Sequence, residues 1–268
     1  MSIGSAWRSF MGSMDKEQSF KLLDYFFDAG GNFIDTANNY QNEESEEWIG
    51  EWMAKRKNRD QIVIATKFTT DYKSAANEYA MAFGKTPFSI YQGRWNVMRR
   101  DFEREIIPMA RHYGMALAPW DVLGGGKFQG KKALEERAKK GEGLRSMFGA
   151  EQNEEEKKVS EALEKVAAEH GVESLTAIAL AYVRAKANNV FAMVGGRKVE
   201  HLKDNIEALS IKLTEEQVEF LESVKTLDIG FPNDFIGPDP HVTGQFTGLA
   251  AANAPIEVER LPKPAGLA

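Results

Sequence analysis

Apolar and polar positions alternate along the chain in two periods, one typical of helices and one of buried strands. Amphipathic helices are predicted, from apolar side chains three or four positions apart, at residues 15–30, 43–56, 100–114, 153–171, 175–187, 198–209 and 214–225, with a weaker one at 74–84. Strands are predicted, from short apolar runs, at residues 32–36, 61–68, 87–92, 115–120 and 190–195. Because strands and helices follow one another in alternation, the pattern predicts right-handed βαβ units and a parallel sheet.

A barrel of βα units is the architecture that this order of elements favours. The first predicted strand is not followed by a G-x-G-x-x-G sequence, so a Rossmann-type dinucleotide fold has no support. A closed barrel of the (β/α)8 TIM type needs eight strands, whereas the chain offers five and the short fragment 1–4. The sequence therefore predicts an α/β fold of this barrel type that is incomplete, with about six βα units and two strands missing.

The composition excludes several classes of function. With a net charge of −6 and a pI near 5.5, the chain is not expected to bind nucleic acid or an anionic membrane surface. It has no cysteine, which excludes disulfides and thiolate chemistry, and no metal site is predicted. No apolar run is long enough to cross a bilayer, and residues 1–17 lack the features of a signal peptide. We therefore expect a cytoplasmic protein.

Two stretches depart from the alternating pattern. The Gly- and Lys-rich segment at about 124–150 includes GGGKFQGKK, which lacks the spacing of a phosphate-binding P-loop and is interpreted as a flexible insertion. From residue 228 the chain is rich in Pro and Gly, and it is expected to lie over the surface or to be partly disordered. The predicted organisation is a barrel over residues 1–227 followed by a tail over residues 228–268.

Three polar side chains near successive strand ends carry the candidate chemistry. Asp35 lies at the end of the strand 32–36, Tyr40 follows five positions later, and Lys67 lies at the end of the strand 61–68. The C-terminal ends of neighbouring parallel strands open onto the same rim, so these side chains are expected to meet there. An ammonium group beside a phenol lowers the pKa of the phenol, which suits a general acid that protonates a carbonyl oxygen. A strand-end Asp or Lys taken alone is more often a cap or a surface ion pair, but the three together favour function.

Five segments in order resemble the aldo-keto reductases: GGNFIDTANNY, IVIATKF, PFSIYQGRWN, MALAPWDVLGGGKF and VGGRKVEHLKDNIEAL. The likeness is nearest to the fungal aryl-alcohol dehydrogenase and norsolorinic acid reductase subgroup, and it extends from about residue 2 to residue 225. The resemblance implies a (β/α)8 barrel that binds NADPH without a Rossmann domain and reduces aldehydes and ketones. It also implies that Tyr40 is the proton donor, that Lys67 lowers its pKa, and that Asp35 holds Lys67.

The resemblance further implies the cofactor contacts. Gln92 matches the amide that contacts the nicotinamide carboxamide, and Trp120 or its neighbour matches the aromatic residue that stacks on the nicotinamide ring. The stretch that grips the adenosine phosphate is matched by Gly195, Arg197, Lys198, His201 and Asn205. Arg197 or Lys198 would pair with a 2′-phosphate, which favours NADPH over NADH. An ordinary charged helix face is the alternative, but the glycine pair 195–196 at the strand-to-helix joint, where backbone can approach a phosphate, favours the cofactor.

The chain departs from the family pattern after the ATKF motif. Family members carry a catalytic histidine at the end of the next strand, whereas the four histidines here lie near helices or in the tail: His112, His170, His201 and His241. That strand and the one after it are absent, so a gap is predicted near residues 73–74. A shortened paralogue and the product of a mis-spliced gene would both have this pattern. The sheet edges beside the gap would be open or closed through a partner in a homo-oligomer.

Two functions follow as hypotheses, beside a third account in which the gene product is defective. The first is an NADPH-dependent reductase of a ketone or aldehyde on an aromatic small molecule, such as a norsolorinic acid-like polyketide of aflatoxin-type secondary metabolism. The second is a catalytically silent module that keeps a cofactor pocket and acts through protein contacts. Asp35, Tyr40 and Lys67 favour the first hypothesis, and the missing histidine favours the second.

Overall fold

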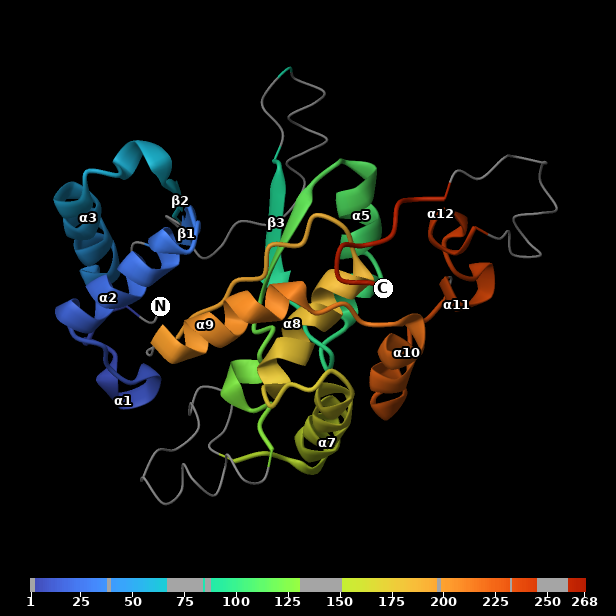
Figure 1. Ribbon diagram of the computed structural model, residues 1–268. Coiled ribbons are helices and arrows are strands. Elements are labelled where there is room, and N and C mark those ends of the chain that lie inside the picture. The colour runs from blue at the N-terminus through green and yellow to red at the C-terminus, as the bar shows by residue number, and fades with distance from the viewer. Residues whose placement is uncertain are drawn as a thin grey trace.

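The computed structural model describes residues 3–37, 40–66, 84, 88–130, 151–196, 199–231, 233–244 and 260–268, without the side chains of Phe10, Met11 and His241. The predicted gap at residues 73–74 and the predicted helix 74–84, apart from Gly84, lie outside these residues. Figure 1 shows how the described elements are arranged.

The strands form two parallel pairs, as the alternating pattern predicts. β1 (Phe33–Asp35) pairs with β2 (Val63–Ala65), and β3 (Ile90–Arg94) pairs with β4 (Ala116–Trp120). The register places the last residues of β1 and β2 side by side, and likewise those of β3 and β4. In the described part of the chain, the predicted α/β class with an incomplete set of strands is confirmed.

The segment 190–195, predicted as a fifth strand, runs parallel beside β4 without forming a regular strand. Val190 makes a single parallel bridge to Leu117, and the Phe191 N–H donates to the Leu117 carbonyl oxygen at 2.8 Å. Two further backbone hydrogen bonds continue the pairing, from the Leu117 N–H to the Asn189 carbonyl at 2.9 Å and from the Met193 N–H to the Pro119 carbonyl at 2.8 Å. The predicted strand is thus present as an extended segment paired with β4, although its only regular bridge among the described residues is at Val190.

Six helices begin and end close to their predicted positions: α2 (Lys16–Asp28), α3 (Glu44–Arg56), α7 (Glu154–Glu169), α8 (Leu175–Lys186), α9 (Val199–Glu207) and α10 (Glu215–Val224). A capping box opens α10, where the Gln217 N–H donates to the Thr214 hydroxyl and the Gln217 side chain accepts from the Thr214 N–H. Short helices appear in addition at α1 (Arg8–Met11), α11 (Asn233–Ile236), α12 (Pro240–Thr243), η1 (Arg59–Gln61) and η5 (Ala208–Ser210).

The predicted helix 100–114 is divided into a 3-10 turn, η2 (Asp101–Glu103), and α5 (Ile106–His112). Proline lacks an N–H and is tolerated in the first turn of a helix but not in its interior. Because α5 begins at Ile106, Pro108 falls within its first turn, whereas one helix from residue 100 would place Pro108 in the interior. The prediction of a single helix is wrong for this reason.

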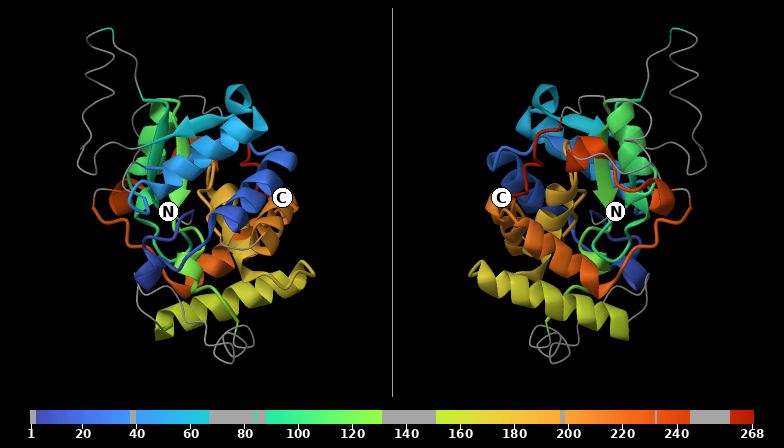
Figure 2. Two further views of the ribbon diagram at one scale, coloured as in Figure 1. Left: turned by 90° about the vertical axis from the view of Figure 1, so that its left-hand side faces the viewer. Right: turned by 90° about the vertical axis from the view of Figure 1, so that its right-hand side faces the viewer.

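Two hydrophobic cores hold these elements. The smaller core lies among α2, α3, β1 and β2 and includes Leu23, Ile34 and Trp52. The larger core surrounds α8, whose Ile178 and Tyr182 are fully buried. α9 contacts both α2 and α8, and Figure 1 shows it lying between them. Figure 2 shows α7 lying across one end of the region that contains the larger core.

The first part of the predicted flexible insertion is fixed in the core. η3 (Gly124–Gly126) follows β4, Phe128 is buried, and the Lys127 ammonium lies 2.9 Å from the Glu156 carboxylate. Gly124 has a φ of +58°, and an added Cβ would come within 2.8 Å of the Phe128 ring. The prediction of a flexible segment is therefore wrong for residues 124–130, because a buried ring and a buried ion pair hold them; residues 131–150 lie outside the described residues.

Part of the predicted tail packs against α8 and against Leu213, two residues before α10. The Leu213 N–H donates to the Gly266 carbonyl at 2.9 Å, and the Gly266 N–H donates to the Arg184 carbonyl at 3.1 Å. An added Cβ on Gly266 would come within 2.6 Å of the Arg184 backbone, so this close approach requires glycine. Residues 260–268 are thus tied into the fold, while the boundary at residues 227–228 stays a prediction.

The outer edges of β2 and β3 pair with no strand in the part of the chain that the structure describes. Val63 of β2 is 53% exposed and Ile90 of β3 is 40% exposed. Because open edges are templates for pairing with another chain, we expect the purified protein to self-associate and to be less stable than a complete barrel. Light scattering and thermal unfolding measure both properties. A monomer that unfolds cooperatively well above roughly 65 °C would contradict the expectation.

Candidate active site

A hydrogen bond joins the two strand pairs near the C-terminal ends of their strands. The Gln92 amide Nε2, on β3, donates to Oδ1 of Asp35, the last residue of β1, at 3.0 Å. The two residues are 57 positions apart in the sequence. The structure thus brings together a residue predicted for catalysis and a residue predicted for cofactor binding.

Arg94 and Trp120 extend this rim. Side chains two positions apart on a strand share a face, so Arg94 lies on the same face of β3 as Gln92. Arg94 is in register with Trp120 of β4, and its guanidinium lies 5.7 Å from the centre of the Trp120 ring. Trp120 is 40% exposed. A partly exposed aromatic ring at a strand end offers a surface on which another planar ring can stack.

Asp121 directly follows β4 and holds Arg94. The Arg94 Nε donates to Asp121 Oδ2 at 2.6 Å, and the Asp121 side chain is only 2% exposed. Burial raises the pKa of the Asp121 carboxyl, and the hydrogen bond from Arg94 opposes part of that rise. Neither residue was predicted from the sequence, although Asp121 follows a predicted strand in the same way as Asp35 ends one.

Tyr40 opens a turn with unusual backbone geometry. The next three residues, Gln41, Asn42 and Glu43, have φ angles of +56°, +54° and +79°. Such conformations of non-glycine residues cost roughly 1–3 kcal/mol each and persist only where the surrounding structure enforces them. They cluster at active sites and ligand clamps, so the geometry of this turn favours a functional role.

Trp7 holds this turn in place. Its backbone N–H donates to Gln41 Oε1 at 2.7 Å, and its indole N–H donates to Asn42 Oδ1 at 3.0 Å. The Trp7 and Tyr40 rings contact each other edge to face, with centroids 6.2 Å apart. Gly4 covers Gln41 so closely that an added Cβ would come within 2.5 Å of its side chain. The candidate proton donor therefore lies on a turn fixed by residues from the start of the chain.

The structure does not place three of the predicted site residues. Lys67, Arg197 and Lys198 lie outside the described residues, and their roles stay predictions. Gly195 ends the extended segment 190–195 that runs beside β4. His201 and Asn205 lie on α9, where Asn205 is buried and His201 is exposed. These last residues thus belong to elements other than those of the Asp35–Gln92 pair.

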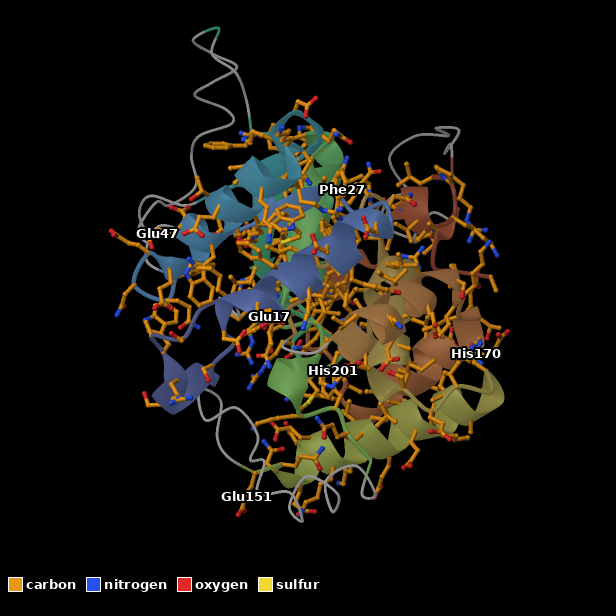
Figure 3. All side chains as sticks on the ribbon, turned by 60° about the vertical axis from the view of Figure 1, so that its left-hand side comes forward. Glu17, Phe27, Glu47, Glu151, His170 and His201 are labelled. Carbon is orange, nitrogen blue, oxygen red and sulfur yellow. The ribbon has the colours of Figure 1, made fainter. Side chains whose placement is uncertain are left out.

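None of the described histidine side chains lies at the end of a strand. His112 ends α5, His201 lies on α9, and His170 follows α7, where its Nε2 lies 3.0 Å from Gln217 Oε1. Figure 3 labels His170 and His201. The His241 side chain is outside the described set. These positions agree with the prediction that a strand-end histidine is missing.

Among the described residues, no cluster of three or more His, Asp or Glu side chains could hold a metal ion. Within the same part of the chain, every helix is too short or too polar to cross a bilayer.

Parallel strand pairs flanked by helices, with an acid and an amide at strand ends, define an α/β protein of the barrel type with a polar site on its rim. The chain belongs to the aldo/keto reductase family, whose sequence model matches residues 1–82 and 70–226. The resemblance seen in the five motifs is confirmed, and with it the barrel class and an oxidoreductase that acts on carbonyl or alcohol groups.

Three fungal relatives illustrate the similarity. AAD14 of Saccharomyces cerevisiae, classed as an aryl-alcohol dehydrogenase, is 54% identical, and the alignment covers 95% of this chain and 89% of AAD14. The aldo-keto reductase ausK of Aspergillus calidoustus is 45% identical over 96% of this chain and 85% of its own. An aryl-alcohol dehydrogenase of Phanerodontia chrysosporium, whose name specifies NADP(+), is 43% identical over 87% of this chain and 82% of its own. Similarity to the fungal aryl-alcohol dehydrogenases is therefore confirmed.

The same alignments bear on the predicted gap. The alignment with AAD14 extends over 335 positions, more than the 268 residues of this chain, so AAD14 carries residues without a counterpart here. The two segments matched to the family overlap at residues 70–82, which include the predicted gap at 73–74. Both observations are expected of a chain that lacks an internal part of the family's barrel.

Proposed function

We propose that this protein is an NADPH-dependent reductase of aldehydes or ketones on aromatic molecules. The observation that carries the proposal is the Asp35–Gln92 hydrogen bond, because it puts the strand-end acid and the candidate nicotinamide-binding amide on one rim. Tyr40 lies five residues beyond Asp35, on the turn held by Trp7. The names of two relatives, as aryl-alcohol dehydrogenases, support an aromatic substrate.

The proposed reaction needs a proton at the carbonyl oxygen as hydride reaches the carbonyl carbon. Tyr40 is assigned the role of the donor. Lys67 lowers the pKa of the Tyr40 hydroxyl, since a neighbouring ammonium group favours the phenolate. Asp35 pairs with Lys67, and the Gln92 amide fixes the orientation of the Asp35 carboxylate. In the proposed mechanism, these four residues would act in sequence, from Gln92 through Asp35 and Lys67 to Tyr40 at the substrate.

NADPH, when bound, supplies the hydride. The described residues fit a nicotinamide, because a primary amide, Gln92, and a partly exposed aromatic ring, Trp120, lie on one face of neighbouring strands two register positions apart. Gln92 would hold the carboxamide, and Trp120 would stack on the ring. The adenosine end is assigned to Gly195, Arg197, Lys198, His201 and Asn205.

The finer proposal is that the substrate is a polyketide ketone of the norsolorinic acid type, in aflatoxin-type secondary metabolism. It rests on the motif resemblance, and the ausK relatives are named only as aldo-keto reductases. NADPH consumption with an aryl aldehyde tests the general proposal of an aromatic carbonyl substrate, and NADPH consumption with an anthraquinone ketone tests the finer proposal of a polyketide. Turnover of the aldehyde alone would support the aryl-alcohol dehydrogenase assignment and would contradict the proposal of a polyketide substrate.

NADPH is expected to bind more tightly than NADH. A charge-assisted hydrogen bond from Arg197 or Lys198 to the 2′-phosphate contributes about 1.5–3 kcal/mol, which is about 10- to 100-fold in affinity. Calorimetric titration with both cofactors measures this ratio. Arg197→Met is expected to remove most of it, while Arg8→Met, at an exposed position on α1, is the matched control. Equal affinities of the wild-type protein for the two cofactors would contradict the assignment.

The missing strand-end histidine favours a second function, a silent module that binds the cofactor without reducing a carbonyl. None of the described histidine side chains is positioned to orient a carbonyl beside Tyr40 in the way that the family's histidine does. NADPH binding with no turnover of either substrate would support this second function. Turnover that depends on Tyr40 would exclude it.

A further inference from the structure

A cavity lies between the loop after β3 and the residues after α10. It has a volume of about 220 Å³, and its lining includes Arg99, Arg100, Arg104, Lys225, Asp101 and Asp228. Because a water molecule takes up about 30 Å³ in the liquid, the cavity has room for a small ligand and not only for a single water. Four basic and two acidic side chains thus line one cavity of a chain whose net charge is −6.

Two of these cations are already neutralised. The Arg100 guanidinium lies 2.8 Å from the Glu103 carboxylate and 2.9 Å from the Glu222 carboxylate. The Lys225 ammonium lies 2.7 Å from the Glu155 carboxylate. Across the described ranges, Arg99 and Arg104 form no ion pair. Arg99 and Arg104 are therefore the lining cations outside an ion pair, and the Asp101 and Asp228 carboxylates of the same lining oppose their charge.

Arg104 has a donor without an acceptor. One terminal nitrogen of its guanidinium donates to the Asp228 backbone carbonyl at 2.8 Å, whereas the Nε–H is buried and donates to no group in the described structure. A buried donor left without a partner destabilises the folded state. Because Arg104 also lines the cavity, an oxygen-bearing anion there would pair with the charge of its guanidinium group.

We propose that this cavity binds a phosphate group, free or as part of a small phosphate ester. Phosphate oxygens suit the fork of guanidinium donors that Arg99 and Arg104 provide. Asp101 and Asp228 also line the cavity and would repel an anion that offers acceptors alone. A protonated phosphate, or the hydroxyl groups of an ester, would instead donate hydrogen bonds to these carboxylates. The lining thus favours a hydroxyl-bearing phosphate over chloride or a simple carboxylate.

The test is calorimetric titration of the full chain with inorganic phosphate, and in parallel with ribose 5-phosphate, at constant ionic strength set with sodium chloride. The wild-type protein is expected to bind phosphate, and Arg104→Met to weaken binding by about 10- to 100-fold, the equivalent of one lost charged hydrogen bond. Arg99→Met is expected to act in the same direction. Because the Arg99 side chain forms no hydrogen bond or ion pair among the described residues, this variant keeps the test valid if Arg104→Met fails to fold.

Two variants serve as controls. Arg8→Met changes an exposed arginine on α1 and is expected to leave phosphate binding unchanged. Arg197→Met identifies phosphate that occupies the proposed adenosine end of the cofactor site instead. Tighter binding of ribose 5-phosphate would identify an ester as the natural ligand, and equal binding would identify the free anion. Absence of phosphate binding, or binding lost in Arg197→Met but retained in Arg99→Met and Arg104→Met, would overturn the proposal.

Discussion

Tyr40→Phe is expected to lower the rate of carbonyl reduction by about 10²- to 10⁴-fold, the usual contribution of a general acid. The variant keeps the aromatic ring, so the edge-to-face contact with Trp7 and the packing of the turn are retained. What it loses is the hydroxyl proton, which in the proposed function moves to the carbonyl oxygen. NADPH affinity is expected to stay nearly unchanged. The measurements are NADPH oxidation with an aryl aldehyde and calorimetric titration of NADPH.

Two further variants make that result specific. Tyr25→Phe removes a hydroxyl from α2 while keeping the ring beneath Lys203, and it is expected to leave turnover unchanged. Lys67→Met is expected to slow the same step as Tyr40→Phe, because a phenol without a neighbouring ammonium gives up its proton less readily. Turnover that survives Tyr40→Phe would refute the role assigned to the hydroxyl. The wild-type protein is itself expected to be slow, since one orienting hydrogen bond from the family's histidine is missing.

Arg100→Met is expected to lower the free energy of unfolding by about 3–5 kcal/mol, the usual cost of removing one partner from a buried ion pair. The Arg100 side chain is 10% exposed and joins Glu103 on η2 to Glu222 on α10. Without it, these two carboxylates would share a single cation, the ammonium group of Lys186. Urea-induced unfolding of the wild-type protein and the variant measures the difference.

The physical reason lies in how completely this cluster is connected. Burial disfavours the charge on Arg100, but the hydrogen bond to Glu103 and the neighbouring carboxylates outweigh it and raise the pKa of the guanidinium. Burial and the nearby carboxylates both raise the pKa of Tyr182, so its hydroxyl stays protonated. That hydroxyl donates to Glu222 at 2.9 Å or to Glu103 at 3.1 Å. Removing one member leaves a buried charge with too few partners.

The same cluster makes the free energy of unfolding depend on pH. Burial would raise the pKa of Glu103, but the hydrogen bond from Arg100 and the charge of Lys186 outweigh it and lower the pKa. A carboxyl group whose pKa is lowered by folding stabilises the folded state above its unfolded pKa, about 4.3, and loses that contribution as the pH falls through its folded value. The unfolding free energy of the wild-type protein is therefore expected to decline below about pH 4.

A surface ion pair is the matched comparison. The Lys157–Glu154 pair has a separation of 2.6 Å, but its side chains are 51% and 82% exposed. Lys157→Met is expected to change stability far less than Arg100→Met does, because water already screens an exposed pair. Equal effects of Lys157→Met and Arg100→Met would show that burial does not give the cluster its importance.

Local patterns in the sequence were sufficient for much of the fold. Apolar side chains at helical spacing gave α2, α3, α7, α8, α9 and α10 near their observed positions, and short apolar runs gave β1 to β4. Strand ends pointed to Asp35, Tyr40 and Gln92. Periodicity, helix caps and turn residues act within a few positions along the chain, which is why they can be read without a structure. The split at Pro108 was missed although its cause is local, because apolar periodicity continues through it.

The sequence by itself determined the order of elements, the family motifs and the residue types near each strand end. Only the tertiary structure decided which of these residues meet: Gln92 with Asp35, Arg94 with Asp121, and Arg100 with Glu222. It also decided the positive φ angles after Tyr40 and the burial of Phe128. Contacts between residues tens of positions apart depend on how whole elements pack, and no short-range pattern encodes that distance or direction. For the same reason, the cavity proposed to bind phosphate is formed from two segments that neither composition nor motif could join.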